Sequence, residues 1–393
     1  MIYKTHIIAY LLFSILFIGC SDKVSKSNTM SEDVSYLHTL MHSVYFWNDT
    51  LKTYSDIELT QFETTQDLLD DMRYSLDKWS AIQTYEDYNN SANQIDSGFG
   101  CIYKRDDDKL YILETEFDSP CDNAGIQRGD LVISINAILG PDLTNEEYTT
   151  MQENVGVESV FIVERNSTLN TFNVAPIEYS YKTVKHQILE QNSTKIGHII
   201  YESFTSTSSS EIEEAFTSFK DNNVTELIID LRYNGGGSLA VASILLDKIG
   251  GSITEDSLQY TLQYNPNNTQ YNESGYFSQD ANSLNLSRVL FLTTDGSASA
   301  SELVINALKP YLDVVQIGKT THGKPVGMNG YERDNIIYWP ITFETVNANG
   351  IGGYFDGIDP TCTSEDNIQY LRTDENGDML KEALYYIKNG GCS

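Results

Sequence analysis

The chain has 393 residues, 40% of them hydrophobic, so it is long enough for two or three domains with a sizeable core. Its 25 basic and 56 acidic residues give a formal net charge of −31 at pH 7. A field of this sign repels phosphate backbones, which argues against a nucleic-acid partner and otherwise favours solubility.

The N-terminus carries the features of an export signal. Lys4 and His6 precede an apolar run over residues 7–18. A basic start followed by a short apolar stretch predicts a secretory signal peptide over residues 1–19, because the run is too short to cross a bilayer comfortably.

The end of this signal resembles a bacterial lipobox. Leu16-Phe17-Ile18-Gly19-Cys20 places a cysteine directly after a small residue. The resemblance implies that Cys20 is lipidated and becomes the new N-terminus, with the polar residues 20–30 as a tether. The chain would then be exported and anchored to a bacterial membrane, facing the periplasm or the cell surface. The alternative is a plain signal peptide followed by an unrelated cysteine.

Four cysteines remain after Cys20, and they are Cys101, Cys121, Cys362 and Cys392. An even number behind an export signal predicts disulfides. Four cysteines allow three pairings, of which sequence neighbourhood favours Cys101–Cys121 and Cys362–Cys392. Because the chain has no Cys-x-x-Cys motif and no Cys/His cluster, we expect neither a metal site nor another cofactor.

Residues 31–92 are predicted to form a small N-terminal helical region. Apolar residues recur every three to four positions from Ser31 to Trp47, which is the period of an amphipathic helix. A second helix is predicted over Thr64 to Trp79, since Thr64 and Asp67 form a capping pattern ahead of an apolar face.

Residues 93–178 read as short strands separated by turns. A short helix is predicted around Glu146 to Gln152, and Val160 to Glu164 is expected to be the final strand. The pattern Ser-Pro…Ala-Gly…Gly-Asp-Leu-Val-Ile-Ser-Ile-Asn, which begins at Ser119, resembles a PDZ domain in the permuted form of bacterial proteases.

This PDZ resemblance implies capture of a peptide C-terminus, which such domains add as a strand while backbone N–H groups hold its carboxylate. Gly98, Phe99 and Gly100 would form the carboxylate loop, and Tyr148 and Met151 would line the side-chain groove. The alternative for the last two residues is that they only fill the core of the module.

Residues 179–393 follow an α/β pattern in which a strand, a small-residue loop and a helix occur twice. The buried-type strand Leu227–Leu231 runs into the glycine loop before a helix, and Val289–Leu292 runs into the stretch GSASASEL. This arrangement predicts a layered α/β domain with its site at the carboxyl ends of the strands.

Ser299 and Lys324 are the candidate catalytic residues of this domain. A serine hydroxyl is a weak nucleophile until a base takes its proton, and none of the six histidines has the context of a serine triad. A lysine can act as the base when burial lowers its pKa enough to leave it neutral, and serine–lysine pairs are an established variant.

Several ordered motifs are similar to those of the C-terminal processing peptidases, also called tail-specific proteases, and the resemblance covers nearly everything after about residue 31. This family carries an inserted PDZ domain before its catalytic core. The matching motifs are DKWSAI (Asp77–Ile82), DLRYNGGG (Asp230–Gly237), GSASASEL (Gly296–Leu303), HGKP (His322–Pro325) and GYFDGIDP (Gly353–Pro360).

Roles follow from this resemblance residue by residue. Ser299 would be the nucleophile and Lys324 the general base. The backbone N–H of Ala300, together with that of Gly236 or Gly237, would form the oxyanion hole. Alanines would flank the serine because a substrate backbone must come within attack distance.

One departure from the family concerns the group that orients the lysine. Many members carry Gln four residues after it, whereas this chain has Met328. His322 and Tyr354 are the candidates to replace it.

The sequence therefore predicts a multi-domain α/β protein, with a layered, ClpP/crotonase-like peptidase core over residues 179–393 and an inserted PDZ domain over 93–178. The predicted function is a serine endopeptidase that cuts proteins near unstructured C-terminal tails selected by the PDZ domain. Two alternatives are a catalytically weak PDZ scaffold and a ligand-binding protein, since a retinoid-binding family shares a similar core.

Overall fold

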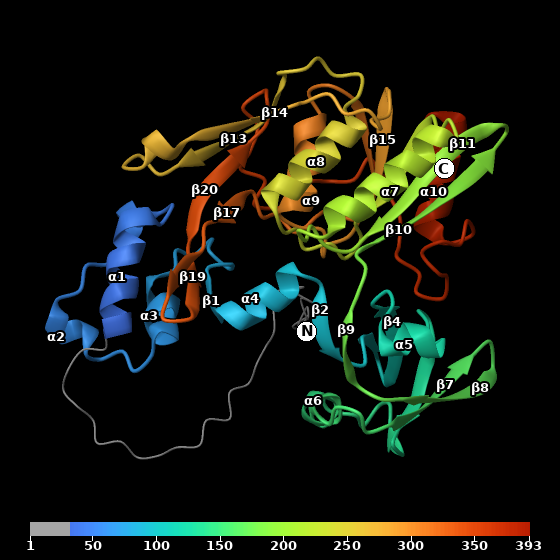
Figure 1. Ribbon diagram of the computed structural model, residues 1–393, viewed down its shortest axis with the longest axis horizontal. Coiled ribbons are helices and arrows are strands. Elements are labelled where there is room, and N and C mark those ends of the chain that lie inside the picture. The colour runs from blue at the N-terminus through green and yellow to red at the C-terminus, as the bar shows by residue number, and fades with distance from the viewer. Residues whose placement is uncertain (1–31) are drawn as a thin grey trace.

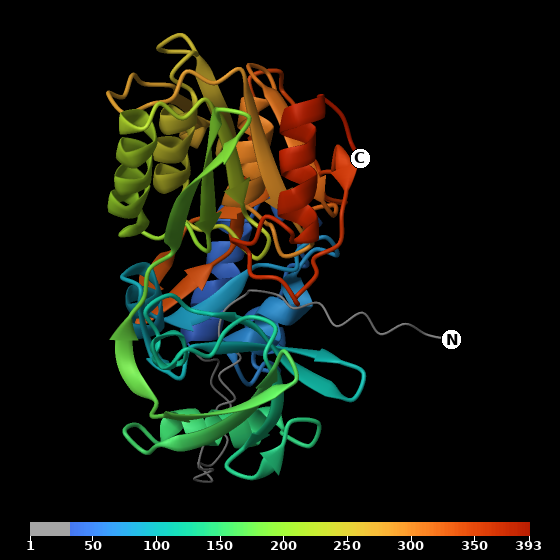
Figure 2. The same ribbon diagram turned by 90° about the vertical axis from the view of Figure 1, so that its right-hand side faces the viewer.

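The computed structural model describes residues 32–393. The predicted signal peptide, the tether and Cys20 lie outside this range. Three regions surround the middle of the molecule: N-terminal helices, an inserted module and a larger α/β core (Figures 1 and 2). Among the described residues, no helix is both long enough and apolar enough to cross a membrane.

The N-terminal region packs its helices onto strands from the far end of the chain. Its helices are α1 (Glu32–Val44), η1 (Asn48–Thr50), α2 (Asp56–Leu59), α3 (Thr65–Met72) and α4 (Tyr85–Ala92). Apolar residues of α1 and α3, such as Leu37 and Leu68, share one buried cluster with Val326 and Ile341. The helices therefore form a structural unit with the core.

The predicted helix from Thr64 to Trp79 is wrong in its second half, because α3 ends at Met72. The Asp77 carboxylate accepts hydrogen bonds from the backbone N–H groups of Trp79 and Ser80, each at 2.9 Å. Such a local side-chain acceptor offers the backbone an alternative to helix and turns the chain here.

The inserted module, residues 95–180, forms a sheet of its own with strand order β3-β4-β5-β7-β8, and β3 lies at an edge. A separate pair, β2 and β9, runs beside it. The elements are β2 (Ile95–Gly98), β3 (Cys101–Asp106), β4 (Lys109–Thr115), α5 (Pro120–Ala124), β5 (Leu131–Ile135), β6 (Ile138–Leu139), α6 (Asn145–Glu153), β7 (Ser159–Arg165), β8 (Thr168–Val174) and β9 (Ile177–Ser180).

Two strands of this module follow the one that the sequence predicts as last. β8 pairs with β7 through the turn Asn166-Ser167, where both residues have positive φ, 51° and 61°. A two-residue turn of this kind matches the twist of a hairpin. The polar sequence of β8 hides the strand, because much of it faces solvent.

The α/β core is built on a six-stranded sheet of order β10-β11-β12-β15-β16-β21, parallel from β11 onward. Helices α7, α8 and α9 cover one face and α10 covers the other (Figure 2). The elements are β10 (Val184–Gln191), β11 (Thr194–Tyr201), α7 (Ser208–Asp221), β12 (Glu226–Asp230), α8 (Leu239–Ile249), β15 (Arg288–Thr293), α9 (Ala300–Leu308), β16 (Asp313–Gly318), β21 (Cys362–Thr363) and α10 (Asp378–Asn389).

Two smaller sheets join this core to the N-terminal region. One has the order β14-β13-β20-β17 and the other β1-β19-β18. Their elements, with one short helix, are β1 (Ala81–Thr84), β13 (Leu258–Tyr264), η2 (Thr269–Tyr271), β14 (Glu273–Tyr276), β17 (Val326–Met328), β18 (Tyr331–Arg333), β19 (Ile336–Trp339) and β20 (Ile341–Val346).

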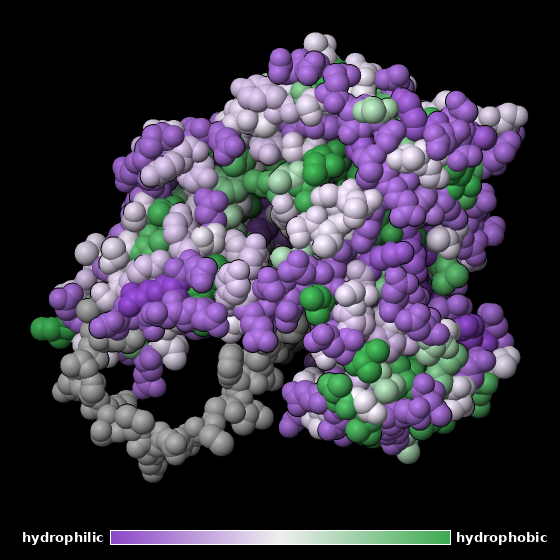
Figure 3. Space-filling model, in the orientation of Figure 1, coloured by the Kyte–Doolittle hydropathy of each residue, from purple (hydrophilic) through white to green (hydrophobic). Residues whose placement is uncertain are grey.

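Parallel strands place their carboxyl ends at one edge of a sheet, so the loops after β12, β15 and β16 meet there. These loops carry the glycine-rich, serine-rich and lysine motifs. Figure 3 shows a hollow in the middle of the molecule, where the three regions approach one another.

Two disulfides are present in the structure. Cys101 pairs with Cys121 at a Cα–Cα distance of 5.8 Å, and Cys362 pairs with Cys392 at 5.6 Å. The first joins the start of β3 to α5 inside the module, and the second joins β21 to the segment after α10.

Candidate active site

Ser299 lies at the turn between β15 and α9, directly before the first residue of the helix. Its backbone has φ 56° and ψ −113°, a conformation that costs free energy for a residue with a side chain. The turn places Ser299 at a helix N-terminus, where backbone N–H groups have no partner within the helix.

The small residues around Ser299 fasten this turn to the loop after β12. The Ser297 hydroxyl donates to the Leu231 carbonyl at 2.6 Å, and the Ser301 hydroxyl donates to the Asn234 carbonyl at 2.9 Å. Both serines are fully buried. These contacts leave no room for larger side chains, and they account for the composition of GSASASEL.

The glycine-rich loop packs directly against the serine. A Cβ atom on Gly236 would lie 2.8 Å from both Ser299 Cβ and Ala300 N, so only glycine fits there. The Gly236 N–H already donates to Asn234 Oδ1 at 2.8 Å. The Gly237 N–H donates to no acceptor within residues 32–393. Of the three predicted oxyanion-hole donors, Gly237 and Ala300 therefore remain.

Glu302 connects the serine turn to the lysine loop. Its Oε2 accepts the Ser299 N–H at 2.9 Å and the Lys324 N–H at 2.8 Å. Its Oε1 accepts the Thr321 hydroxyl at 2.6 Å and the Gly323 N–H at 2.7 Å. One buried carboxylate thus fixes both loops, although burial raises its pKa.

Lys324 is buried, with 8% of its surface exposed, in the loop between β16 and β17. Desolvation lowers the pKa of its amine to about 8, although the negative charges of Asp77 and Glu302 oppose this shift. A fraction of the amine is therefore neutral near pH 8. In the described part of the chain, no hydrogen bond joins Lys324 Nζ to Ser299 Oγ.

Neither candidate replacement for the missing glutamine contacts the lysine amine by a hydrogen bond. His322 Nε2 accepts the Trp79 indole N–H at 3.2 Å, and the Tyr354 hydroxyl lies 3.5 Å from Thr345 Oγ1. Met328 packs against the apolar cluster of the N-terminal region.

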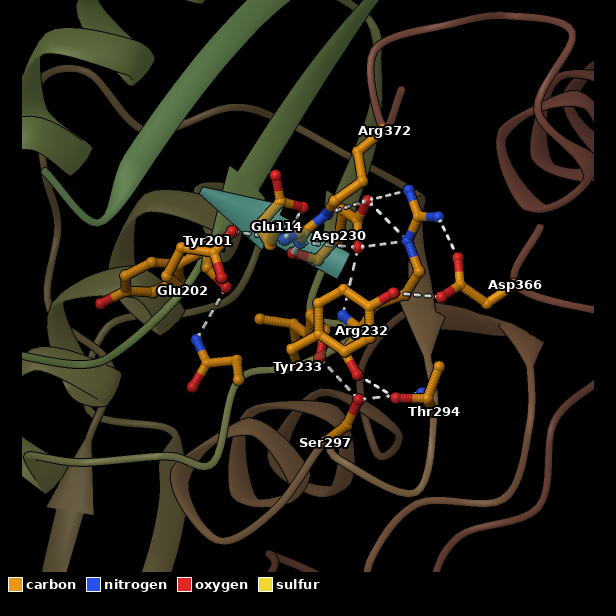
Figure 4. Close-up of polar contacts among 12 residues, drawn as sticks. Glu114, Tyr201, Glu202, Asp230, Arg232, Tyr233, Thr294, Ser297, Asp366 and Arg372 are labelled. Atoms are coloured by element: carbon orange, nitrogen blue, oxygen red, sulfur yellow. Dashed lines mark hydrogen bonds and ion pairs between the residues drawn. The ribbon is translucent and has the colours of Figure 1, made fainter. Parts of the chain in front are cut away.

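A buried ionic network holds the start of the loop after β12 (Figure 4). Asp230 accepts hydrogen bonds from Arg232 at 2.6 Å and Arg372 at 3.0 Å, and Asp366 accepts from Arg232 at 2.6 Å. Burial alone would raise the pKa of the Asp230 carboxyl, but the two guanidinium groups hold it far below its usual range.

The same network reaches into the inserted module. Arg128 of the module donates to Asp366 at 2.6 Å and to the Tyr233 hydroxyl at 2.7 Å. Glu114 of β4 pairs with Arg372 at 3.6 Å. The backbone of the glycine-rich loop is thus joined to the module through side chains that are nearly all buried.

The predicted peptide-binding residues gather beside the edge strand β3. Gly98 and Gly100 have φ of 146° and 68°, and the Phe99 carbonyl accepts the Cys121 N–H at 2.9 Å. Tyr148 and Met151 of α6 pack against the buried cluster of the module. Both residues thus contribute to the core while lying next to β3.

Sequence reasoning missed Asp77 and Trp79 as neighbours of the site, together with the partners Arg128, Asp366 and Arg372. Asp77 and Trp79 lie within the DKWSAI motif, which is a usable signal. Arg128 falls within the PDZ-like pattern, at a position that the pattern does not specify, and Asp366 and Arg372 belong to no motif. Only the fold brings these three residues into the network around Asp230.

Comparisons with known proteins point to one family of peptidases. The profile of peptidase family S41 matches residues 195–363, and that of the peptidase S41 N-terminal domain matches residues 36–81. The carboxy-terminal processing protease CtpB of Bacillus subtilis is 25% identical over 331 residues, which cover 78% of this chain and 65% of that protein. A CtpA-like serine protease of Staphylococcus epidermidis is 23% identical, over 67% of this chain and 52% of its own length.

Solved structures show the same fold. The crystal structure of an S41 protease from Bacteroides fragilis NCTC 9343 matches with a TM-score of 0.75 at 23% identity, covering 90% of this chain and 97% of that chain. The photosystem II D1 C-terminal processing protease matches with a TM-score of 0.55 at 15% identity, covering 89% of this chain and 97% of that one. The predicted α/β class is confirmed, and the chain belongs to peptidase family S41, the C-terminal processing peptidases. The match covers 65% of the length of CtpB and 52% of the length of the CtpA-like protease.

Proposed function

We propose that the protein is a serine endopeptidase in which Ser299 is the nucleophile and Lys324 the general base. The neutral Lys324 amine takes the hydroxyl proton while Ser299 Oγ attacks the scissile carbonyl carbon. The N–H groups of Ala300 and Gly237 stabilise the oxyanion of the tetrahedral intermediate. The ammonium then returns the proton to the leaving amine, and water hydrolyses the acyl-enzyme.

The observation that carries this proposal is the Glu302 carboxylate, which binds the backbone of both proposed catalytic residues. Ser299 sits in a strained turn at a helix N-terminus, and Lys324 is buried with its pKa lowered to about 8. Strain and burial of this kind cost stability, and they support a functional role for the pair.

Peptide cleavage and labelling by a fluorophosphonate probe test the mechanism. We expect the probe to label Ser299 in the wild type, and the variants Ser299→Ala, Lys324→Ala and Lys324→Arg to lose turnover. Arginine cannot replace a base that must be neutral, since guanidinium remains protonated. Near-wild-type turnover of Lys324→Arg would contradict the mechanism, and a wild type that binds peptides without cleaving them or labelling would favour the scaffold alternative.

We also propose that the inserted module acts as a PDZ domain and selects unstructured C-terminal tails. β3 is an edge strand to which a peptide can add, and α6 lies beside it. The N–H groups of Phe99 and Gly100 donate to no acceptor within the described residues, so they are free to bind a carboxylate. Free-acid peptides should bind at least ~10-fold more tightly than their amides, because amidation removes the charge that these groups hold. Equal affinity would rule this binding mode out.

We propose lastly that Cys20 anchors the exported protein to a membrane, on the lipobox-like stretch alone. Cys20→Ala should move the protein from the membrane fraction to the soluble fraction. Unchanged partitioning of this variant would count against the anchor.

A further inference from the structure

The Lys324 amine lacks a hydrogen-bonded partner although it is buried. Within residues 32–393 its Nζ forms no hydrogen bond and no ion pair, whereas its backbone N–H is fixed by Glu302. Its Nζ lies 5.9 Å from the centre of the Trp79 ring. The position of the proposed base is therefore determined by packing and by nearby charge.

Trp79 belongs to the turn Asp77–Ser80, which is tightly fixed by hydrogen bonds. The Asp77 carboxylate accepts from the Tyr45 hydroxyl at 2.7 Å and from the Ser80 hydroxyl at 2.6 Å, in addition to the N–H groups of Trp79 and Ser80. Ser80 Oγ in turn accepts the Ile341 N–H of β20 at 3.0 Å. The turn is thus attached to both the N-terminal region and the core.

The indole ring of Trp79 is held from the catalytic side as well. Its N–H donates to His322 Nε2 at 3.2 Å, and the His322 N–H donates to the Ser297 carbonyl at 2.9 Å. The ring also stacks on Phe355, with centroids 6.5 Å apart. Because only 3% of Trp79 is exposed, its face beside Lys324 cannot move freely.

We propose that the turn Asp77–Ser80 positions the Lys324 amine, with the indole face of Trp79 as its contact surface and the Asp77 carboxylate as its counter-charge. This inference rests on the proposed function of Lys324 as the base. Trp79 and Asp77 are positioning residues. They orient the Lys324 amine in place of the glutamine that many family members carry, because Met328 has no hydrogen-bonding group.

The chemistry explains why such a contact suits a lysine base. When the amine takes the Ser299 proton it becomes an ammonium, which an aromatic face and a nearby carboxylate both stabilise. The other charged or titratable groups around the amine are Glu302 on α9 and His322, two residues earlier in the same loop. The Tyr45 hydroxyl donates to Asp77, and Tyr354 lies near Glu302.

Variants of the turn test this inference by separating kcat from KM. We expect Trp79→Leu to lower kcat roughly 5- to 30-fold with little change in KM, because the cation–π contact is lost. Trp79→Phe keeps an aromatic face and should remain within about 3-fold of the wild type, although it loses the bond to His322. Equal kcat for Trp79→Leu and the wild type would overturn the proposal, as would equal loss in both variants.

The pH dependence gives a readout that a purely structural role would not move. Asp77→Asn removes a negative charge that favours the ammonium, so the midpoint of the rise in kcat/KM with pH should move to lower pH. Asp49→Asn, an exposed residue of the same region, is the matched control and should leave the midpoint in place. An unchanged midpoint in Asp77→Asn would contradict the role of its charge.

A second measurement does not depend on turnover. Titration of the Lys324 side chain by NMR, with 13C-labelled lysine and Lys324→Met for assignment, should show the same downward shift in Asp77→Asn. If the wild type cleaves no peptide, the proposed function fails while this titration still tests the coupling. An identical titration in the wild type and Asp77→Asn would refute the inference even in an active enzyme.

Discussion

At the scale of single residues, Glu302 binds both loops of the proposed dyad through four hydrogen bonds. Glu302→Gln replaces one acceptor oxygen by an NH2 group that would face N–H donors. We expect kcat to fall at least ~100-fold, with a loss of about 1–3 kcal/mol in the free energy of unfolding. Peptide cleavage and denaturant unfolding measure the two effects.

The control for this substitution is Glu332→Gln, which makes the same change on an exposed residue of β18. It should alter neither activity nor stability beyond ~0.5 kcal/mol. Wild-type kcat in Glu302→Gln would show that the carboxylate is not required to hold Ser299 and Lys324 together.

Burial of Lys324 should lower the free energy of unfolding, since the pKa of its amine falls from 10.5 to about 8 on folding. Between these values the unfolded state binds more protons than the folded state, so stability rises with pH through this window. Below pH 8 the full cost applies, roughly 3 kcal/mol at 1.36 kcal/mol per pKa unit.

Lys324→Met should therefore raise the free energy of unfolding by ~1–3 kcal/mol at pH 7 while it abolishes turnover, and the gain should shrink by pH 10. Denaturant unfolding at both pH values measures this difference. Lys78→Met, at an exposed lysine, serves as the control. A gain of equal size at pH 7 and pH 10 would exclude the protonation of Lys324 as its cause.

Sequence motifs identify some residues of the proposed site, but they do not predict the contacts between these residues. Ser299 and Lys324 were identifiable because both lie in short, ordered motifs. Gly236 was identifiable because it lies in the glycine-rich motif after β12. The indole of Trp79 reaches Lys324 across more than two hundred positions of sequence, and no local pattern predicts such a contact. The sequence could not decide between the Gly236 and Gly237 N–H groups, because the bond from Gly236 to Asn234 Oδ1 depends on a side-chain orientation.

At the scale of elements, β3 and α6 frame the proposed peptide groove, and the Tyr148 hydroxyl spans them. This hydroxyl donates to the Cys101 carbonyl at 3.3 Å, on the edge of the sheet. A peptide that adds to β3 needs such edge carbonyls as acceptors for its own N–H groups.

Tyr148→Phe should therefore bind free-acid peptides about 2- to 10-fold more tightly, because it frees the Cys101 carbonyl without removing the ring. Tyr103→Phe is the matched control, since the Tyr103 hydroxyl is buried without a hydrogen-bond partner among the described residues. Isothermal titration of both variants with one peptide measures the effect. Weaker binding by Tyr148→Phe would mean that its hydroxyl contacts the peptide itself.

Elements were predictable where periodicity was strong and missed where a side chain or a turn decided the path. The apolar faces of α1, α8 and α9 indicated these helices, and buried runs indicated β12 and β15. The predicted helix after Thr64 was too long because the backbone leaves the helical conformation at Arg73, and the next N–H, that of Tyr74, donates to the Tyr45 hydroxyl at 3.0 Å. Hydrophobic spacing does not reveal this bond. The hairpin at Asn166-Ser167 was missed because β8 is largely polar and exposed, so it lacks the apolar run that marks a buried strand.

At the scale of the whole molecule, Arg128 forms several of the contacts that join the inserted module to the catalytic core. It donates to Asp366, to the Tyr233 hydroxyl and to the Tyr370 carbonyl, all beyond the module. Asp366 also pairs with Arg232, whose backbone carbonyl accepts from the Thr294 hydroxyl near Ser299. A disturbance at the module is therefore transmitted to the glycine-rich loop through contiguous buried contacts.

Arg128→Met should weaken this connection by ~2–4 kcal/mol, because it leaves Asp366 and Tyr233 with fewer partners in a buried site. We expect faster amide hydrogen exchange both in the module and in residues 230–237. Arg165→Met is the matched control, since Arg165 pairs with Asp130 at 2.6 Å entirely within the module. It should speed exchange in the module alone. Equal protection of residues 230–237 in both variants would mean that the module and the proposed active site unfold independently. Loss of the Arg128–Asp366 pair, which crosses between them, would then affect the glycine-rich loop no more than loss of a pair within the module.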